Sequence, residues 1–330
     1  MSTVLEVTDL HVSFNTPDGV VQAVRGVSFS VEEGEVLGIV GESGSGKSVS
    51  VLAAMGLLPR SARITGSIRY RGQELIGLTE TELRGLRGGE IAMIFQDPMT
   101  SLNPVLSVGF QIAEAVETHR PGTKRDAAMA KAAELLDLVG IPNATARARQ
   151  YPHEYSGGMR QRAMIAMAIA NDPDVLIADE PTTALDVTVQ AQILEVLETA
   201  QEATRSAMVL ITHDLGMVAG VADRVSVMYA GRVAETGSVF DVFGQPRHPY
   251  TLGLLGSLPR LDETGDEQLV PITGSPPSLV HPPPGCAFHP RCRFAQAVCS
   301  QDTPALRPIE GTGQRSACHF AETLEGASAR

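Results

Sequence analysis

The chain lacks the features that place a protein inside or across a membrane. No apolar run approaches the roughly 20 residues that a membrane-spanning helix needs. The longest candidate, residues 163–170, stops at Asn171-Asp172-Pro173-Asp174. The N-terminus shows no basic segment followed by an apolar one, so no secretory signal is visible. We therefore expect a cytoplasmic protein, which would meet a membrane only through a partner.

Positive charge and cysteine are also scarce. The balance of 26 Lys and Arg against 38 Asp and Glu gives a net charge of −12. This is unlike the basic footprint of nucleic-acid-binding proteins, so no nucleic-acid partner is expected. The four cysteines all lie beyond residue 285, and such clustering in a reducing compartment favours a metal site over disulfides. A length of 330 residues allows about two domains.

One stretch, Gly41-Glu42-Ser43-Gly44-Ser45-Gly46-Lys47-Ser48, matches the pattern G-x-x-x-x-G-K-[ST] at each fixed position. Residues 36–40 before it predict a buried strand, and residues 48–58 after it predict a helix. The glycines let successive backbone N–H groups turn inward around phosphate oxygens, assisted by the positive end of the helix. Lys47 can reach the β- and γ-phosphates, and Ser48 can ligate Mg²⁺. The predicted triphosphate-binding residues are Gly41, Ser43, Gly44, Ser45, Gly46, Lys47 and Ser48.

The periodicity of the remaining chain predicts an α/β fold. Residues 1–34 alternate apolar and polar positions, which indicates antiparallel strands with a turn at Pro17-Asp18-Gly19. Helical spacing dominates residues 107–170 and indicates an insertion between strands of the core. Further strands are predicted at 64–70, 91–95, 175–178, 208–212, 225–229 and 232–235, and helices at 79–86, 187–204 and 250–258. Beyond residue 244 the chain becomes rich in loops and proline.

Polar side chains stand at the ends of three predicted apolar strands, where parallel sheets place their ligands. Gln96 follows strand 91–95. Asp179 and Glu180 close strand 175–178, so that Asp179 can hold Mg²⁺ while Glu180 orients or deprotonates the attacking water. His213 follows strand 208–212 and could bond a γ-phosphate, although a lone histidine at such a position is more often structural.

Two other features stay ambiguous on the residues alone. Ser156-Gly157-Gly158 opens a predicted helix, where it either caps that helix or binds an anion. Phe14 ends the first predicted strand and fits a core aromatic slightly better than a ring stacked on adenine.

Taken together, these motifs resemble those of an ABC-transporter ATPase, with the resemblance covering about residues 4–245. The matching features occur in family order: the phosphate loop, Gln96, Ser156-Gly157-Gly158, residues 175–180, Ala184-Leu185-Asp186 and His213. The resemblance implies a P-loop NTPase with a RecA-like core and an antiparallel β subdomain. It places the ATPase domain at residues 1–245, with a helical ABC signature subdomain at about 98–170. It also assigns Phe14 to adenine stacking instead of the core.

Members of this family pair head to tail. The resemblance implies that ATP bound on Lys47, Ser48 and Asp179 of one subunit is covered by the helix that opens at Ser156 of the other. Asp186 then lies at the interface, and hydrolysis releases the pair.

The resemblance also gives Gln96 a role in sensing Mg²⁺ and in linking to the helical subdomain, which grips a membrane subunit. Glu180, His213 and Gln96 make up the catalytic set. Tyr155 departs from the family pattern, which commonly has Leu before the serine, so the packing at this position is in question.

Three stretches resemble the oligopeptide and dipeptide (peptide/nickel) importers more closely: residues 96–104, His248-Pro249-Tyr250-Thr251 and Gly285-Cys286-Ala287-Phe288-His289-Pro290-Arg291-Cys292. The last two belong to a C-terminal extension at residues 246–330. The resemblance implies the ATP-hydrolysing subunit of a bacterial peptide importer, docked on two transmembrane permease subunits. A second ATPase, expected to be a paralogue, completes the pair, and an extracytoplasmic binding protein selects the substrate.

The cysteines are spaced C-x5-C-x6-C-x18-C, unlike the paired C-x2-C of ordinary zinc ribbons. Four thiolates can hold a [4Fe–4S] cluster, as this region does in some members of the subfamily. We expect such a cluster on Cys286, Cys292, Cys299 and Cys318, with zinc and unligated thiols as alternatives. Its expected role is to fold a proline-rich tail that lacks a core of its own.

The sequence also leaves three other functions to consider. Related importers carry nickel, glutathione or sugars. Non-transport ABC ATPases act on DNA or ribosomes, but they carry long coiled coils, zinc modules or two cassettes. A nucleotide-binding regulator without turnover fits poorly with Glu180 and His213 both present.

Overall fold

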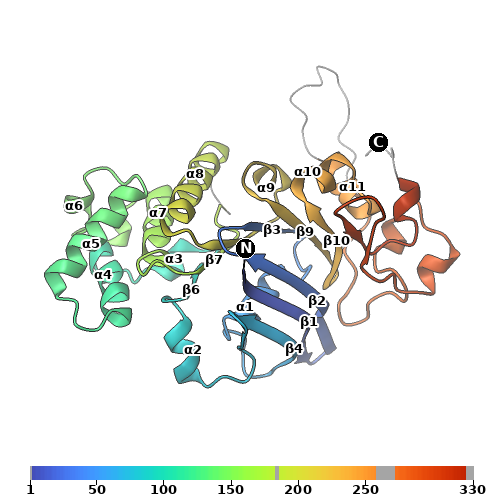
Figure 1. The fold of residues 1–330 in the computed structure, drawn as a ribbon, viewed down its shortest axis with the longest axis horizontal. Coiled ribbons are helices and arrows are strands. Elements are labelled where there is room, and N and C mark those ends of the chain that lie inside the picture. Colours follow the sequence, from blue (N-terminus) through green and yellow to red (C-terminus); the bar gives the residue numbers. More distant parts are fainter. Residues whose placement is uncertain (1, 183–185, 258–271, 325–330) are drawn as a thin grey trace, which may run out of the picture. The chain divides into compact units, whose positions relative to one another are not determined.

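The computed structural model describes residues 2–182, 186–257 and 272–324 (Figure 1). These residues form two compact units. The first unit comprises the described residues within Met1–Leu5, Ser30–Val36 and Arg69–Ile211. The second unit comprises the described residues within Glu6–Phe29, Leu37–Ile68 and Thr212–Arg330. Among the described helices, none combines the length and apolar character that a membrane crossing demands.

Parallel strands form the sheet of the first unit. Strand β7 (Val175–Asp179) pairs with β6 (Ile91–Ile94) on one side and with β8 (Ala207–Thr212) on the other. Every residue of these strands is buried, as expected for parallel strands covered on both faces. Helix α8 (Val187–Thr204) connects β7 to β8. The predicted apolar runs are therefore confirmed as strands of a parallel sheet.

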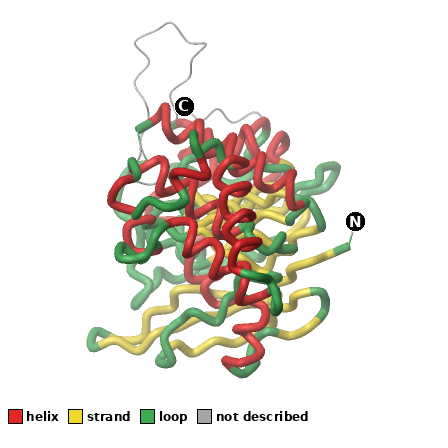
Figure 2. Tube along the Cα trace, turned by 90° about the vertical axis from the view of Figure 1, so that its left-hand side faces the viewer, coloured by secondary structure: helices red, strands yellow, loops and turns green. Residues whose placement is uncertain are grey.

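A group of helices follows β6 in the first unit, as predicted from the spacing at residues 107–170. The main members are α4 (Val108–His119), α5 (Arg125–Leu138) and α7 (Gly157–Ala168), and α5 packs against both others. In Figure 2 this group of helices, drawn in red, lies toward the viewer. The short segments α3 (Pro98–Ser101), α6 (Ala144–Arg147) and the 3-10 turn η1 (Pro152–Glu154) connect them.

Strand order in the sheet of the second unit is β11, β12, β10, β9, β3. Strands β9 (Arg224–Tyr229) and β10 (Arg232–Ser238) form the predicted hairpin, and β3 (Val36–Val40) runs parallel to β9. The short strands β11 (Arg307–Pro308) and β12 (Arg315–Ser316) pair antiparallel, and β12 adds to the edge of β10. The C-terminal segment thus contributes directly to this sheet.

A smaller sheet has the order β2, β1, β4, β5. Strands β1 (Thr3–Thr16) and β2 (Gly19–Glu32) confirm the two strands predicted for residues 1–34. Strand β4 (Ala62–Tyr70) pairs antiparallel with β5 (Gln73–Glu74). Helix α2 (Glu80–Leu86) follows, and its first turn is closed by a capping box between Thr79 and Glu82.

Short helices complete the second unit. They are α1 (Lys47–Ala54), α9 (Leu215–Val221), α10 (Val239–Gly244), α11 (Pro249–Gly256) and the 3-10 turns η2 (His289–Arg291), η3 (Ala297–Ser300) and η4 (Ala321–Leu324). Helix α1 ends earlier than the predicted residue 58, because Gly56 adopts a φ of 59° just beyond the C-cap and turns the chain away. Helix α11 begins at Pro249, and the predicted end at residue 258 lies outside the described residues.

The buried face of α5 yields a test of this packing. Leu136→Ala is expected to lower the free energy of unfolding by about 2–5 kcal/mol, because Leu136 is fully buried and its truncation leaves a cavity. Leu138→Ala, on the same helix at 38% exposure, is expected to lower it by less than about 1 kcal/mol. Urea denaturation of both variants measures the difference. Equal losses at the two positions would contradict the assigned faces of the helix.

Candidate nucleotide site

The phosphate loop joins β3 to α1 in the second unit, as the sequence predicts. Gly41 and Gly46 have φ values of 153° and 98°, which side-chain-bearing residues rarely adopt. A Cβ atom at Gly41 would lie 2.2 Å from the carbonyl oxygen of Met228, and one at Gly46 would lie 2.5 Å from that of Ala23. Both positions therefore require glycine on conformational and steric grounds.

Two polar side chains of the loop are buried. The Lys47 ammonium donates hydrogen bonds to the carbonyl oxygens of Gly41 at 2.7 Å and Glu42 at 3.2 Å. The Ser45 hydroxyl is buried and has no hydrogen-bond partner among the described residues. A buried polar atom without a partner is costly, and the phosphate oxygens of a nucleotide can accept from both groups. Ser43 and Gly44 are exposed at the tip of the loop. The loop therefore fits a polyphosphate anion.

Gln96 and Glu180 come together in the first unit, although they lie 84 positions apart in the sequence. The Gln96 amide donates to the Glu180 carboxylate at 2.9 Å. Asp179, the last residue of β7, is buried, and Glu180 follows it with a φ of 47°. The Glu180 N–H donates to the Ile211 carbonyl at 2.9 Å. A left-handed conformation in glutamate costs roughly 1–3 kcal/mol, and strain of this kind gathers at functional sites.

The serine-glycine-glycine segment forms the start of α7, confirming the predicted helix. Ser156 is its N-cap, and its hydroxyl accepts a hydrogen bond from the Met159 N–H at 3.3 Å. Tyr155, the departure from the family pattern, is buried with its hydroxyl donating to the Arg147 carbonyl at 3.0 Å. Burial raises the pKa of Tyr155 to about 12, so the hydroxyl stays neutral. The tyrosine ring occupies the buried position, and its hydroxyl is satisfied by the hydrogen bond to Arg147.

The other predicted residues lie in different surroundings. Phe14 is half-buried near the end of β1, and His213 is exposed directly after β8. Asp186 caps α8 by accepting a hydrogen bond from the Val189 N–H at 3.0 Å. Its role at a dimer interface stays a prediction, and Ala184 and Leu185 of the same motif lie outside the described residues.

The four cysteines line one pocket in the second unit, together with His248, His289 and His319. Burial is the main reason why the pKa of Cys292 rises to about 11 and that of Cys318 to about 12, and the neighbouring thiols add to both shifts. The described residues contain no group of three or more His, Cys, Asp or Glu placed to hold a metal ion. The [4Fe–4S] cluster therefore remains a prediction.

Sequence reasoning missed two residues that bond the phosphate loop, Tyr250 and Arg291. The Tyr250 hydroxyl accepts from the Glu42 N–H across 208 positions, and Arg291 pairs with the Glu42 carboxylate across 249 positions. Glu42 occupies a variable position of the motif, so the motif itself carries no signal for these partners.

The glycine-shaped loop after β3, the Gln96–Glu180 pair and the serine-capped helix α7 define an ATP-binding cassette. Residues 24–183 match the family described as ABC transporter, and residues 234–299 match the oligopeptide/dipeptide transporter C-terminal region. Two solved structures share the fold. MJ0796, a bacterial ABC transporter cassette solved as a dimer, has a TM-score of 0.64 at 25% identity and covers 71% of this chain and 98% of its own. CbiO1 from Clostridium perfringens has a TM-score of 0.62 at 28% identity and covers 74% and 92%.

Close relatives show which group of ABC transporter proteins the chain resembles. The dipeptide transport ATP-binding protein DppD of Bacillus subtilis is 57% identical over 92% of this chain and 91% of the relative. The oligopeptide transport ATP-binding protein OppD of Escherichia coli is 53% identical over 91% of this chain and 88% of the relative. OppD of Mycobacterium tuberculosis is 55% identical over the whole chain, which spans only 54% of that relative's length. The chain belongs to the ABC transporter family, among the oligopeptide and dipeptide transport ATP-binding proteins.

Lys47→Ala is expected to weaken ATP binding by about 10- to 100-fold, because it removes the buried ammonium that is placed to meet phosphate oxygens. Titration of the purified protein with a fluorescent ATP analogue measures the change. Lys124→Ala is the matched control, since Lys124 is exposed and precedes α5 in the first unit, and its affinity should equal that of the wild type. Unchanged affinity in Lys47→Ala would remove this lysine from the site.

Proposed function

We propose that this chain is the ATP-binding and ATP-hydrolysing subunit of a bacterial ABC importer for di- and oligopeptides. The observation that carries the proposal is the glycine-shaped loop with the buried Lys47, because this geometry serves phosphate binding. The hydrogen bond between Gln96 and Glu180 supports hydrolysis in addition to binding. The relatives that are named for oligopeptide and dipeptide transport support the peptide cargo.

The loop and its lysine neutralise charge on the β- and γ-phosphates of ATP. Mg²⁺, when bound, adds positive charge next to the same phosphates, and Ser48, Asp179 and Gln96 are the residues proposed to hold it. Glu180 acts as the group that orients the attacking water and accepts its proton. The Gln96 amide fixes the Glu180 carboxylate through their 2.9 Å hydrogen bond.

Several other residues act around the nucleotide in this proposal. Phe14 stacks on the adenine, and His213 bonds the γ-phosphate. The helix that opens at Ser156-Gly157-Gly158 covers ATP bound to a second ATPase subunit, and Asp186 lies at that interface. Ser156 and Gly157 are exposed at the N-terminal end of α7, where the positive end of the helix dipole favours an anion.

The assembly follows from the same proposal. The chain carries an ATPase domain at residues 1–245 and an extension at 246–330. Its helical subdomain, about residues 98–170, docks on the cytoplasmic side of two permease subunits. A paralogous ATPase completes the pair, and an extracytoplasmic binding protein delivers the peptide. Uptake assays with labelled di- and oligopeptides, nickel and glutathione test the cargo, and uptake of nickel or glutathione alone would exclude peptide import.

We also propose a [4Fe–4S] cluster on Cys286, Cys292, Cys299 and Cys318. All four line one pocket, and the Cys286 N–H donates to the Cys299 carbonyl at 2.8 Å, so their segments are already joined. Thiolates are the ligands that such a cluster takes. When bound, the cluster would cross-link distant points of a proline-rich segment, which is a structural task.

Glu180→Gln is expected to retain ATP affinity and to lower the hydrolysis rate by at least about 100-fold, because the amide cannot accept a proton from water. The ATP-bound variant should also stay associated with its partner ATPase, or with a second copy, in size-exclusion chromatography with light scattering. Glu202→Gln, at an exposed position of α8, is the control and should hydrolyse ATP at the wild-type rate. Turnover at the wild-type rate in Glu180→Gln would exclude the assigned role.

Anaerobically purified protein is expected to contain about four iron and four acid-labile sulfide atoms per chain, the composition of one [4Fe–4S] cluster. Replacing all four cysteines by serine should abolish both signals and the visible absorbance. Zinc in place of iron, or four titratable free thiols with no metal, would each refute the cluster.

A further inference from the structure

Glu42, the second residue of the phosphate loop, is held by bonds to its N–H, its carbonyl and its side chain. Its N–H donates to the Tyr250 hydroxyl at 2.8 Å. Its carbonyl oxygen accepts from the Lys47 ammonium at 3.2 Å. Its carboxylate accepts two hydrogen bonds from the Arg291 guanidinium, from Nη1 at 2.7 Å and Nη2 at 2.9 Å. The backbone N–H and the side chain of Glu42 are therefore both held by residues far along the chain.

The pairing with Arg291 is shielded and fully hydrogen-bonded. The Arg291 side chain is only 6% exposed, against 25% for Glu42. Its Nε donates to the Thr273 carbonyl at 3.0 Å, and Nη1 also reaches the Tyr229 hydroxyl at 3.3 Å. A planar guanidinium with this many partners loses little freedom when it binds a carboxylate in a two-point fork. Lysine cannot reproduce this geometry.

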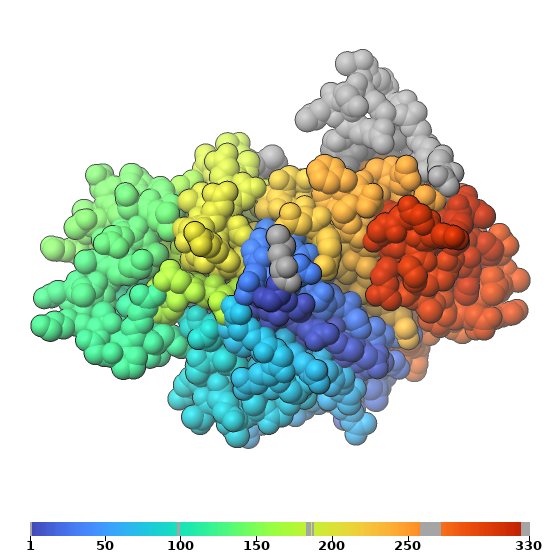
Figure 3. Space-filling model, viewed as in Figure 1, coloured from blue at the N-terminus to red at the C-terminus, as the bar shows by residue number. Residues whose placement is uncertain are grey.

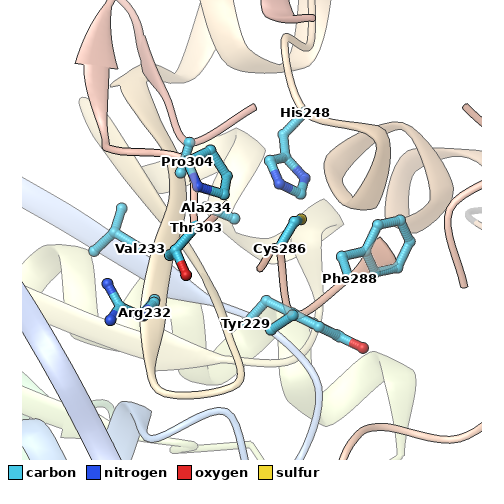
Figure 4. A pocket seen from close by; sticks show the side chains of 11 residues that line it. Tyr229, Arg232, Val233, Ala234, His248, Cys286, Phe288, Thr303 and Pro304 are labelled. Atoms are coloured by element: carbon cyan, nitrogen blue, oxygen red, sulfur yellow. The ribbon is translucent and has the colours of Figure 1, made fainter. Parts of the chain in front are cut away.

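Aromatic rings hold Tyr250 and Arg291 in place. The ring of Tyr250 lies 4.6 Å from that of Tyr229 and 5.4 Å from that of Phe288, measured between centroids. The Arg291 guanidinium carbon lies 5.9 Å from the rings of both Tyr229 and Phe288. Figure 4 shows Tyr229 and Phe288 beside Cys286 in the neighbouring pocket. Such contacts stabilise both the aromatic cluster and the cation.

Both partners of Glu42 come from the C-terminal part of the second unit. Tyr250 lies on α11, and Arg291 ends the turn η2 directly before Cys292. The described residues beyond 272 form a compact group, coloured dark orange to red in Figure 3. This group supplies the guanidinium, and α11 supplies the hydroxyl. The segment that carries the cysteines is thus bonded to the loop that carries Lys47.

We propose that Tyr250 and Arg291 are positioning residues of the nucleotide site, and that the C-terminal segment sets the shape of the phosphate loop through Glu42. This inference rests on the proposed ATP-binding function. Glu42 directly precedes the N–H groups of residues 43–48, so a rotation of its backbone changes their direction. Its carbonyl, in the peptide group after the one that bonds Tyr250, also accepts a hydrogen bond from the Lys47 ammonium. Losing the bond from Tyr250 or Arg291 therefore disturbs the phosphate contacts of these backbone N–H groups and those of the Lys47 ammonium.

The test compares ATP affinity and steady-state hydrolysis in full-length variants. Arg291→Met is expected to weaken binding of a fluorescent ATP analogue by roughly 3- to 30-fold, the range typical of residues that act on a site without touching its ligand. The KM for ATP should rise by a similar factor. Arg291→Lys should restore only part of the affinity, because it keeps the charge without the fork. The matched control is Arg307→Met, which removes another arginine of this segment that forms a two-point pair with a glutamate, Glu322.

Two further variants separate positioning from a general loss of folding. Tyr250→Phe removes only the hydroxyl that accepts the Glu42 N–H and keeps the packed ring, and it should weaken binding by roughly 3- to 10-fold while the variant still unfolds in one cooperative thermal transition. Glu42→Gln should weaken ATP binding by about as much as Arg291→Met does. The double variant Glu42→Gln, Arg291→Met should bind ATP no more weakly than the weaker-binding of the two single variants, because both changes break the same pair.

These variants distinguish positioning of the loop through Glu42 from a general effect of the C-terminal segment. Wild-type affinity in both Arg291→Met and Tyr250→Phe would overturn the inference, as would fully additive losses in the Glu42→Gln, Arg291→Met double variant. An equal loss in Arg307→Met would also overturn it, since the effect would then belong to the segment and not to the bonds with Glu42. If the wild-type protein itself fails to bind ATP, the proposed function fails and not this coupling.

Discussion

A phosphate loop works only when its backbone points several N–H groups at one place, and in this chain two carbonyl groups enforce that shape. The carbonyl of Met228 on β9 and that of Ala23 on β2 approach Gly41 and Gly46 so closely that no Cβ fits. The loop is further tied down because the Gly231 N–H donates to the Ser45 carbonyl at 3.0 Å. The conformation of the phosphate loop is therefore set by its contacts with the β9–β10 hairpin and with strand β2.

Most of the fold could be predicted because its signals are local. Short apolar runs bounded by polar residues became parallel strands, and the caps Thr79, Ser156 and Asp186 begin helices where the sequence places them. The helix after the phosphate loop was predicted too long, since its apolar pattern continues past Gly56, whose left-handed conformation ends it. Apolar periodicity alone does not reveal such a stop.

The side-chain contacts of the site are non-local, and the sequence indicates them less well. Gln96 and Glu180 were each predicted from their strand ends, yet their hydrogen bond depends on the register of β6 and β7. Tyr250 and Arg291 carry no motif for loop binding, and only their hydrogen bonds to Glu42 in the folded chain reveal their role. The cysteines were grouped into one site from their spacing, and the fold gathers all four in one pocket. Tyr155, an anomaly in the sequence, fits a buried ring with a bonded hydroxyl.

The most direct measurement is a structure of the protein determined with ATP and Mg²⁺ bound. The account predicts the β- and γ-phosphates within hydrogen-bonding distance of the N–H groups of residues 43–48. It also predicts that the Lys47 ammonium has left the Gly41 carbonyl for a phosphate oxygen, while Glu42 keeps its bonds to Tyr250 and Arg291. A triphosphate bound away from this loop, or a Lys47 that still bonds Gly41 beside a bound nucleotide, would contradict the account.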